Sequence, residues 1–335
     1  MYGTRELFNP DKTAALYKSS GIRRPEGCDH YVAVFEDELP VAAAGIKGSI
    51  LMGFAVDKSR QGEGLLALLC TELIRIGSDE GVETFYIFTK PERAFLFAAC
   101  GFRMIGCTGC TALLEWGACS VEDFVGQLRR ISHDKPDGAA CIVMNGNPFT
   151  LGHRHLAVRA AWENPWLYVI VVEEDASEFP YRIRLELIRE GLKDLQNVTV
   201  LGGSHYVISH LTFPDYFLKD KDVGEARAEM DLELFCSHIA PALKISRRYV
   251  GQEPYCAVTA SYNREMKRIL PRRGIELVEI PRRESDGLAI SAGEVRALLR
   301  NEKIEDAKRF LPPVTVQFLD TSEGAEVIKA LRNKG

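Results

Sequence analysis

The sequence predicts an α/β protein with two domains, a smaller α+β domain followed by a larger domain built on a parallel sheet. The chain has 335 residues, and single domains commonly contain about 100–200 residues. The first part of the chain shows strands followed by helices. Strands and helices alternate in the rest, which is typical of a parallel sheet with crossover helices. A polar segment with a proline and a glycine, residues 132–138, separates the two patterns. We therefore predict domains at residues 1–135 and 136–335.

The first domain is predicted to open with a β-hairpin, because two apolar runs flank the acidic residues 36–38. A third strand follows, and a loop with two glycines leads from it into an amphipathic helix with apolar residues at three- and four-residue spacing. The predicted strands are residues 31–35, 40–46, 49–56 and 84–89, and the predicted helices are residues 65–77 and 92–100.

The loop before the long helix contains Gln61, Gly62 and Gly64. Glycines at a helix N-terminus let backbone amides approach a phosphate, although a plain tight turn uses the same residues. The loop and the order of elements resemble the Gcn5-related acetyltransferase family, whose Q/R-x-x-G-x-G/A loop binds the pyrophosphate of coenzyme A. Gln61 and Gly64 match this pattern, whereas Leu66 occupies its last position. The resemblance implies an acetyltransferase-like fold with a site for a coenzyme A-like ligand, but Phe97 stands where many members have a tyrosine acid.

The second domain is predicted to begin with a buried strand, residues 139–144, a tight loop, and a helix that continues to about residue 163. Open parallel sheets bind ligands at the carboxyl ends of their strands, and a helix N-terminus favours an anion. Thr150 and His153 can donate hydrogen bonds to phosphate there, and Gly152 lets the backbone approach closely. The other loop residues that we expect to contact the ligand are Gly146, Asn147 and Phe149.

Two short motifs, one near each end of the second domain, resemble the signatures of the nucleotidyltransferase superfamily. The segment TLGH matches (H/T)-x-G-H, and the later segment ISAGEVR matches I-S-S/A-x-x-x-R, with Gly293 in place of the usual serine or threonine. The resemblance implies a Rossmann-like nucleotidyltransferase domain that binds ATP between the motifs. It assigns Thr150 and His153 to the α-phosphate in the transition state, and Ser291 and Arg296 to the β- and γ-phosphates.

The two domains together resemble the [citrate (pro-3S)-lyase] ligase family along essentially the whole chain. Residues 200–203, 212–219, 249–254 and 259–263 also resemble that family. The resemblance implies an enzyme that uses ATP and Mg²⁺ to acetylate a thiol on the acyl carrier subunit of citrate lyase. That thiol belongs to a phosphoribosyl-dephospho-coenzyme A prosthetic arm, which the first domain would bind. Acetate would attack the α-phosphate to give acetyl-adenylate and pyrophosphate, and the thiol would then take the acetyl group and release AMP.

Some further residues could contact the nucleotide. Lys219 follows an aromatic run and could reach phosphate, although a surface lysine would look the same. Arg182 and Arg184 stand at a predicted helix start and could contact the nucleotide, and Glu253 and Asn263 could contact adenine or ribose. Magnesium that bridges phosphates keeps several water ligands, so we expect few protein ligands to the metal and name none.

Composition and charge argue against several classes of protein. The 42 basic and 47 acidic residues give a net charge of −5, which does not favour nucleic-acid binding. The chain shows no apolar run near the ~20 residues that span a bilayer and no basic-then-apolar leader. We therefore expect no membrane association and a cytoplasmic location. The nine cysteines suggest reduced thiols. Cys107 and Cys110 could bind zinc, but the spacing around them matches no standard four-ligand pattern.

The sequence alone leaves two other activities possible. The second domain alone would permit an adenylyltransferase that acts on a phosphopantetheine or mononucleotide substrate. The first domain alone would permit an acetyltransferase that uses acetyl-coenzyme A, although Phe97 in the tyrosine position argues against it. The ligase interpretation is favoured because it uses both domains.

Overall fold

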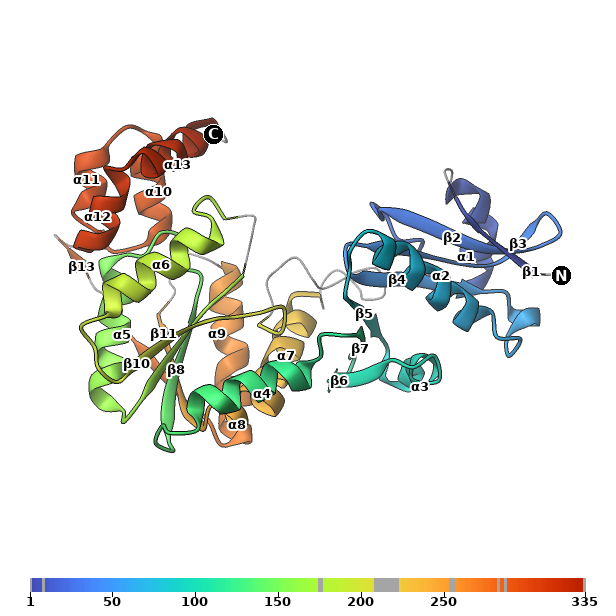
Figure 1. Ribbon diagram of the computed structural model, residues 1–335, viewed down its shortest axis with the longest axis horizontal. Coiled ribbons are helices and arrows are strands. Elements are labelled where there is room, and N and C mark those ends of the chain that lie inside the picture. Colours follow the sequence, from blue (N-terminus) through green and yellow to red (C-terminus); the bar gives the residue numbers. More distant parts are fainter. Residues whose placement is uncertain are drawn as a thin grey trace. The chain divides into compact units, whose positions relative to one another are not determined.

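The computed structural model describes residues 2–7, 10–173, 177–207, 223–252, 257–281, 284–285 and 288–333. The chain forms two compact units (Figure 1). Unit 1 contains Met1–Phe124 and Thr212–Glu233, and unit 2 contains Val125–Leu211 and Leu234–Gly335. Helix α4 (Val121–Ser132) contains the point at which the first segment of unit 1 ends.

Unit 1 is built on a seven-stranded mixed sheet with the strand order β1-β2-β3-β4-β5-β7-β6. The strands are β1 (Tyr2–Glu6), β2 (His30–Glu36), β3 (Leu39–Lys47), β4 (Ile50–Val56), β5 (Thr84–Thr89), β6 (Arg103–Cys107) and β7 (Ala112–Gly117), and the helices are α1 (Ala14–Ser20), α2 (Leu65–Asp79) and α3 (Ala94–Ala98). Strands β4 and β5 are parallel and pair at only two positions, Ile50 with Tyr86 and Leu51 with Ile87. The two strands therefore separate beyond these positions, in the middle of the sheet.

The two faces of this sheet pack against different helices. Alternate side chains of a strand point to opposite faces, so Val32 and Val34 of β2 join the core under α2, whereas Ala33 and Phe35 join the core with α1. Helix α2 lies very close to the sheet, because a Cβ added at Gly77 would be 2.5 Å from the ring of Phe85.

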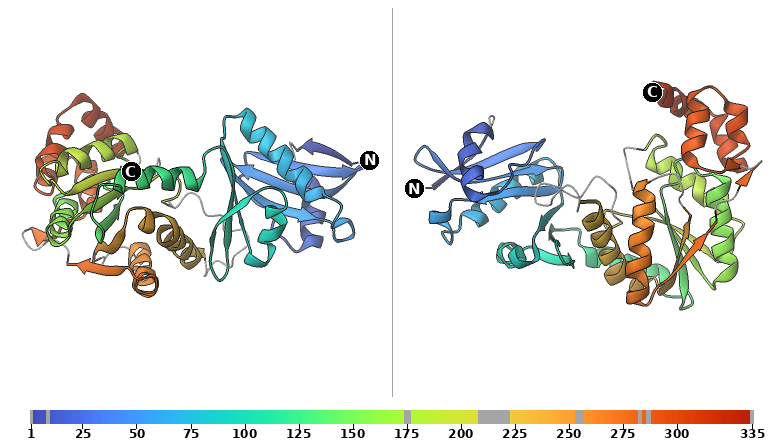
Figure 2. Two further views of the ribbon diagram at one scale, coloured as in Figure 1. Left: turned by 60° about the horizontal axis from the view of Figure 1, so that its bottom comes forward. Right: turned by 180° about the vertical axis from the view of Figure 1, so that it is seen from behind.

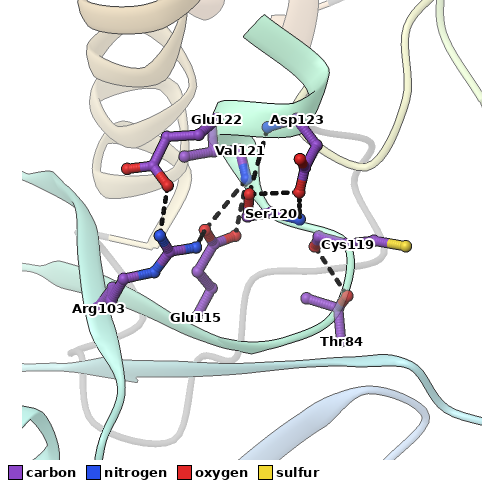
Figure 3. Close-up of polar contacts among 8 residues, drawn as sticks. All are labelled: Thr84, Arg103, Glu115, Cys119, Ser120, Val121, Glu122 and Asp123. Carbon is purple, nitrogen blue, oxygen red and sulfur yellow. Dashed lines mark hydrogen bonds and ion pairs between the residues drawn. The ribbon is translucent and has the colours of Figure 1, made fainter. Parts of the chain in front are cut away.

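The last strand of unit 1 is joined to the start of α4 by a buried carboxylate (Figure 3). Glu115 is 1% exposed, and its side chain accepts hydrogen bonds from the Val121 amide at 3.1 and 3.3 Å and from Arg103 at 3.2 Å. Ser120 caps the same helix end, since its hydroxyl accepts from the Asp123 amide at 3.2 Å. These contacts satisfy amide groups that have no partner within the helix.

Unit 2 contains a five-stranded parallel sheet with the order β10-β9-β8-β11-β12. The strands are β8 (Ala139–Met144), β9 (Leu167–Val171), β10 (Val198–Gly202), β11 (Ile245–Gly251) and β12 (Glu276–Ile280). The helices of this unit are α5 (Leu151–Glu163), α6 (Tyr181–Leu192), α8 (Ala240–Ala242), α9 (Ala257–Ile269), α10 (Ala292–Arg300), α11 (Ile304–Lys308), α12 (Pro313–Leu319) and α13 (Ser322–Asn333). Helix α7 (Val223–Leu234) belongs to unit 1 up to Glu233. The strand order reverses between β8 and β11, which is where open α/β sheets bind ligands.

One core of unit 2 joins the sheet to the C-terminal helices, which form a compact group (Figures 1 and 2). Ile142 of β8 belongs to the same buried cluster as Val295 of α10 and Leu319 of α12. The end of the chain is therefore packed beside the first βα loop of the unit. This arrangement confirms the predicted α/β class, with a mixed sheet in the first part and a parallel sheet in the second.

The elements predicted in the first domain are present with small shifts of their ends. The hairpin of β2 and β3 turns at Asp37, which has a positive φ of 55°. The predicted short helix at residues 92–100 is a 3₁₀ turn followed by α3. Three elements of this unit, β1, α1 and β6, were not predicted, because none of them has a strong hydrophobic period.

Candidate functional site

The carboxyl end of β8 leads directly into a capped helix N-terminus. Thr150 is the N-cap of α5, and its side chain accepts a hydrogen bond from the His153 amide at 3.3 Å. In return the Thr150 amide donates to Nδ1 of His153 at 3.1 Å. Because Nδ1 accepts this bond, the neutral imidazole carries its proton on Nε2. The loop therefore sets the tautomer in which His153 donates through Nε2.

Two contacts, one with α12 and one with the turn that precedes it, hold this loop in place. The buried carbonyl oxygen of Phe149 accepts from the Thr315 hydroxyl at 2.9 Å, and the Leu151 amide donates to the carbonyl oxygen of Phe310 at 2.9 Å. The fully buried ring of Phe149 also stacks near His153, with ring centroids 6.1 Å apart and an interplanar angle of 17°. Phe149 therefore lies behind the imidazole.

The two motifs meet at Gly152. A Cβ added at Gly152 would lie 3.2 Å from the carbonyl oxygen of Ile290 and 3.5 Å from the Thr150 hydroxyl oxygen. Only a residue without a side chain leaves this space open. Gly146 has a φ of +63°, and a Cβ there would be 2.7 Å from Ile188. At both positions a larger residue would crowd the neighbouring atoms of this loop.

The second motif starts another helix beside the first. Ser291 is the N-cap of α10, and its hydroxyl accepts from the Glu294 amide at 3.0 Å. One turn into that helix, Nη1 of Arg296 donates to the carbonyl oxygen of Asn147 at 2.6 Å. Two helix N-termini, the imidazole of His153 and the guanidinium of Arg296 therefore belong to one connected group of residues.

A carboxylate that the sequence analysis missed completes this group. Oε2 of Glu178 accepts from the Asn147 side-chain amide at 2.7 Å and lies 3.3 Å from Nε of Arg296. The side-chain oxygen Oδ1 of Asn147 accepts a hydrogen bond from the Phe179 backbone amide at 3.0 Å. Asn147 thus links two βα loops, and Glu178 orients Arg296. No sequence motif marks Glu178, because it reaches the other two residues only through tertiary folding.

The remaining nucleotide candidates have different positions. Arg184 is fully buried and donates to the carbonyl oxygens of Phe179, Asn145 and Val172 at 2.7–2.9 Å, so it holds the loops after β8 and β9 together. Arg182 is exposed and pairs with carboxylates. The side chain of Asn263 donates to the carbonyl oxygen of Gly251 at 3.2 Å, at the end of β11. Lys219 and Glu253 lie outside the described residues.

The donor set of this site suits a polyanion. Helix N-termini, an imidazole N–H and a guanidinium all favour negative charge, and Gly152 leaves space for it. Among the described residues, no three His, Cys, Asp or Glu side chains form a group that could hold a metal ion. Within the same residues no helix is long and apolar enough to cross a membrane.

Unit 1 contains a separate cavity of about 850 Å³ at the point where β4 and β5 separate. Phe54 and Val56 of β4 and Phe88 and Thr89 of β5 line it. The loop residues Gln61, Gly62 and Gly64 line it too, together with the first turn of α2. Both glycines have positive φ, +90° and +78°.

Phe97, which stands at the expected position of a tyrosine acid, lines this cavity. Its ring is 6% exposed and makes an edge-on contact with Phe54, with ring centroids 5.0 Å apart. A phenyl ring has no proton to donate, so this position supplies no general acid. Lys58, Lys90 and Arg93 also line the cavity, and none of them makes an ion pair within the described part of the chain. The cavity therefore combines an apolar interior with cationic residues.

Comparison with known proteins identifies the family. A family model described as citrate lyase ligase C-terminal domain matches residues 139–319. The [citrate [pro-3S]-lyase] ligase of Escherichia coli K12 is 39% identical over 296 residues, which cover 86% of this chain and 84% of that protein. The same-named proteins of Klebsiella pneumoniae (41% identity, 86% of this chain and 85% of that protein) and Haemophilus influenzae (38%, 90% and 92%) are similar over comparable lengths. The chain belongs to the [citrate [pro-3S]-lyase] ligase family. It is therefore an enzyme of the ligase class.

Solved structures of acetyltransferases match about a third of this ligase-family chain. A GNAT-family acetyltransferase from Desulfovibrio desulfuricans is 16% identical with a TM-score of 0.30, and the match covers 35% of this chain and 99% of that one. The PaiA N-acetyltransferase of Thermoplasma acidophilum, solved with coenzyme A, is 12% identical with a TM-score of 0.30, and the match covers 35% and 99% of the two chains.

Proposed function

We propose that this enzyme acetylates a thiol of citrate lyase at the expense of ATP, in two steps through acetyl-adenylate. The observation that carries the proposal is the junction of the two motifs, where Gly152 lies against the carbonyl oxygen of Ile290 and Arg296 bonds to Asn147. This junction brings two anion-binding helix N-termini together at the strand-order reversal of a parallel sheet.

In the first step the carboxylate of acetate attacks the α-phosphorus of ATP, the bond to the β-phosphate oxygen breaks, and pyrophosphate leaves. Acetate is already ionised at neutral pH, so this step needs no general base. His153 donates from Nε2 to the α-phosphate as charge develops on it, and Thr150 holds the imidazole by the bond to Nδ1. Ser291 and Arg296 bind the β- and γ-phosphates. Catalysis is then mainly positioning and electrostatic stabilisation.

The proposed ATP site also involves Mg²⁺ and the loop residues. Mg²⁺ bound to the phosphates would neutralise part of their charge, and it would retain several water ligands. Gly146 and Gly152 let the backbone approach the nucleotide, while Phe149 supports the imidazole from behind. The backbone carbonyl oxygen of Asn147 accepts a hydrogen bond from Arg296 and so helps to orient the guanidinium. Lys219 stays a candidate phosphate ligand.

In the second step the thiolate of the prosthetic arm attacks the acetyl carbonyl carbon, and AMP leaves. The arm is a phosphoribosyl-dephospho-coenzyme A on the acyl carrier subunit, and we place its binding site in the unit 1 cavity. Gln61, Gly62 and Gly64 would approach its pyrophosphate. An acetyltransferase acting alone in this cavity is disfavoured, because Phe97 cannot protonate a leaving thiolate.

One assay separates this proposal from its alternatives. The enzyme is incubated with ATP, Mg²⁺, radiolabelled acetate and deacetylated citrate lyase, and both label on the acyl carrier subunit and AMP are measured. The proposal expects one AMP per acetyl group transferred. Label that requires acetyl-coenzyme A and no ATP would indicate an acetyltransferase. Pyrophosphate exchange into ATP that requires a phosphopantetheine or mononucleotide substrate, and not acetate, would indicate an adenylyltransferase.

A further inference from the structure

The exposed face of helix α3 is entirely apolar. The helix lies beside β6 and β7, at one edge of the unit 1 sheet (Figure 1). On its inner side, Ala94 and Phe97 are buried in the core of the unit. On its outer side, Phe95 is 67% exposed, Leu96 is 38% exposed and Ala98 is exposed too. A helix that is apolar all round is normally covered on all sides, so the open side of α3 is typical of a surface that binds another molecule.

This apolar face continues into the unit 1 cavity. Leu96 and the next residue after the helix, Ala99, are exposed and also line the cavity, so α3 forms part of the cavity rim. Leu66 and Ala67, in the first turn of α2, line the same cavity directly after the glycine loop. We assign that loop to the pyrophosphate of the prosthetic arm. Because the reactive thiol is at one end of the arm, the carrier is attached at the other end, beyond the pyrophosphate. That end therefore leaves the cavity near α2 and α3.

The rim of the cavity is positively charged, although the whole chain has a net charge of −5. The charged residues that line the cavity are all cationic, and they are Arg23, Lys58, Arg60, Lys90 and Arg93. Lys90 and Arg93 are exposed, directly precede α3 and make no ion pair within the part of the chain that the structure describes. Glu92 stands between them in the sequence and does not line the cavity. A partner that binds at this rim should therefore present acidic residues.

We propose that the outer face of α3, with Lys90 and Arg93 beside it, is the docking surface for the acyl carrier subunit of citrate lyase. The arm is covalently attached to that subunit, so binding of the arm in the cavity brings the surface of the carrier to the rim. Phe95 is the apolar anchor of the contact, and the two cations face acidic residues of the carrier. An exposed aromatic ring among charged residues is a common centre of binding energy in protein interfaces. The inference rests on the proposed binding of the arm in unit 1.

The test measures Kd for deacetylated citrate lyase by biolayer interferometry, with the full-length enzyme and its Phe95→Lys and Phe95→Glu variants. Phe95 is mostly exposed and does not line the cavity, so both variants should fold as the wild type does. Both lose the ring, but only glutamate adds a charge that an acidic carrier repels. We expect Kd to rise about three- to tenfold in Phe95→Lys and at least about 30-fold in Phe95→Glu. The matched control is Leu39→Glu on the β2–β3 hairpin, where Leu39 is 72% exposed, and its Kd should stay within about twofold of the wild type.

Calorimetric titration with free dephospho-coenzyme A separates the docking surface from the arm site. We expect the wild type and both Phe95 variants to bind this probe with the same Kd. If they do, but the variants bind citrate lyase as tightly as the wild type, the docking surface is rejected and the arm site stands. If the wild type does not bind the probe, both are rejected.

Three further results would overturn the inference. Weaker binding of dephospho-coenzyme A in the Phe95 variants would show that this residue acts on the cavity and not on the carrier. A larger loss of citrate lyase binding with lysine than with glutamate would reject an acidic partner. A dimer of the wild-type enzyme that Phe95→Glu dissociates, measured by sedimentation velocity, would assign the face of α3 to a second copy of this chain.

Discussion

Arg296 and Asn147 are 149 positions apart in the sequence, and Nη1 of the arginine donates to the carbonyl oxygen of the asparagine at 2.6 Å. This bond connects the loop after β8 to the first turns of α10. Nε of the same guanidinium lies 3.3 Å from Glu178. The protein's own contacts therefore orient the arginine, which reduces the entropy lost when a ligand binds.

Replacing Arg296 by lysine should keep the positive charge and lose the orientation. A lysine cannot make the Nη1 and Nε contacts together, since it has a single ammonium group. Hydrogen bonds to charged groups contribute about 1.5–3 kcal/mol, so acetate-dependent pyrophosphate exchange into ATP should fall by roughly 10- to 100-fold. An exchange rate within twofold of the wild type would reject the phosphate role of Arg296.

The His153→Ala variant should lose a donor to developing charge. Removal of such a preorganised donor typically costs about 10²–10³ in rate. We therefore expect acetate-dependent pyrophosphate release to fall by that factor, with the circular dichroism spectrum unchanged. Near-normal release from a folded variant would show that another group performs this role.

Gly152→Ala should damage the ATP site by filling space between the motifs. The added methyl group would lie 3.2 Å from the carbonyl oxygen of Ile290, so the segment that carries this oxygen must shift by a few tenths of an ångström relative to α5. We expect KM for ATP to rise by about tenfold or more, from the loss of roughly 1.4 kcal/mol of binding. The matched control is Gly126→Ala on α4, where an added Cβ meets only the Arg130 side chain at 3.9 Å. Equal KM values for the two variants would contradict this interpretation of Gly152.

Glu115→Ala should destabilise unit 1 without touching either proposed site. It leaves the buried Val121 amide without its partner, at a cost of about 1–3 kcal/mol. Glu122→Gln is the matched control, because Glu122 is exposed and its ion pair with Arg103 should contribute under about 1 kcal/mol. Urea unfolding followed by intrinsic fluorescence measures both changes. Similar midpoints for the two variants would show that the Glu115 contacts contribute little.

Alkylation of Cys100 should report its lowered pKa. The neighbouring Cys70 thiol lowers the pKa of Cys100, and only the thiolate reacts, so the rate with iodoacetamide should rise with pH and reach half its maximum below the ordinary cysteine value of about 8.5. Cys70→Ala removes that thiol and should move this midpoint upward, toward the ordinary value. Peptide-resolved mass spectrometry across a pH series measures the midpoint. An unchanged midpoint in Cys70→Ala would show that Cys70 does not set the pKa.

Local sequence patterns predicted the parts of the fold that depend on short-range physics. The apolar run of β8, the N-cap at Thr150 and the spacing of α2 are each encoded within a few residues, and all three are present. Motif residues such as Gly152 and Ser291 were also found from their immediate neighbours, because a helix N-terminus has a local signature.

Only the tertiary structure decided which distant residues support the site. Glu178, Thr315 and the bonds of Arg184 have no local signal, since their partners lie on other elements. The cavity of unit 1 arises from the separation of β4 and β5, which no local pattern encodes. The sequence by itself determined most of the strands and helices, the capped loops and the family of this protein. Long-range packing determined which side chains meet, because such contacts form only when separate elements are brought together by burial of a shared core.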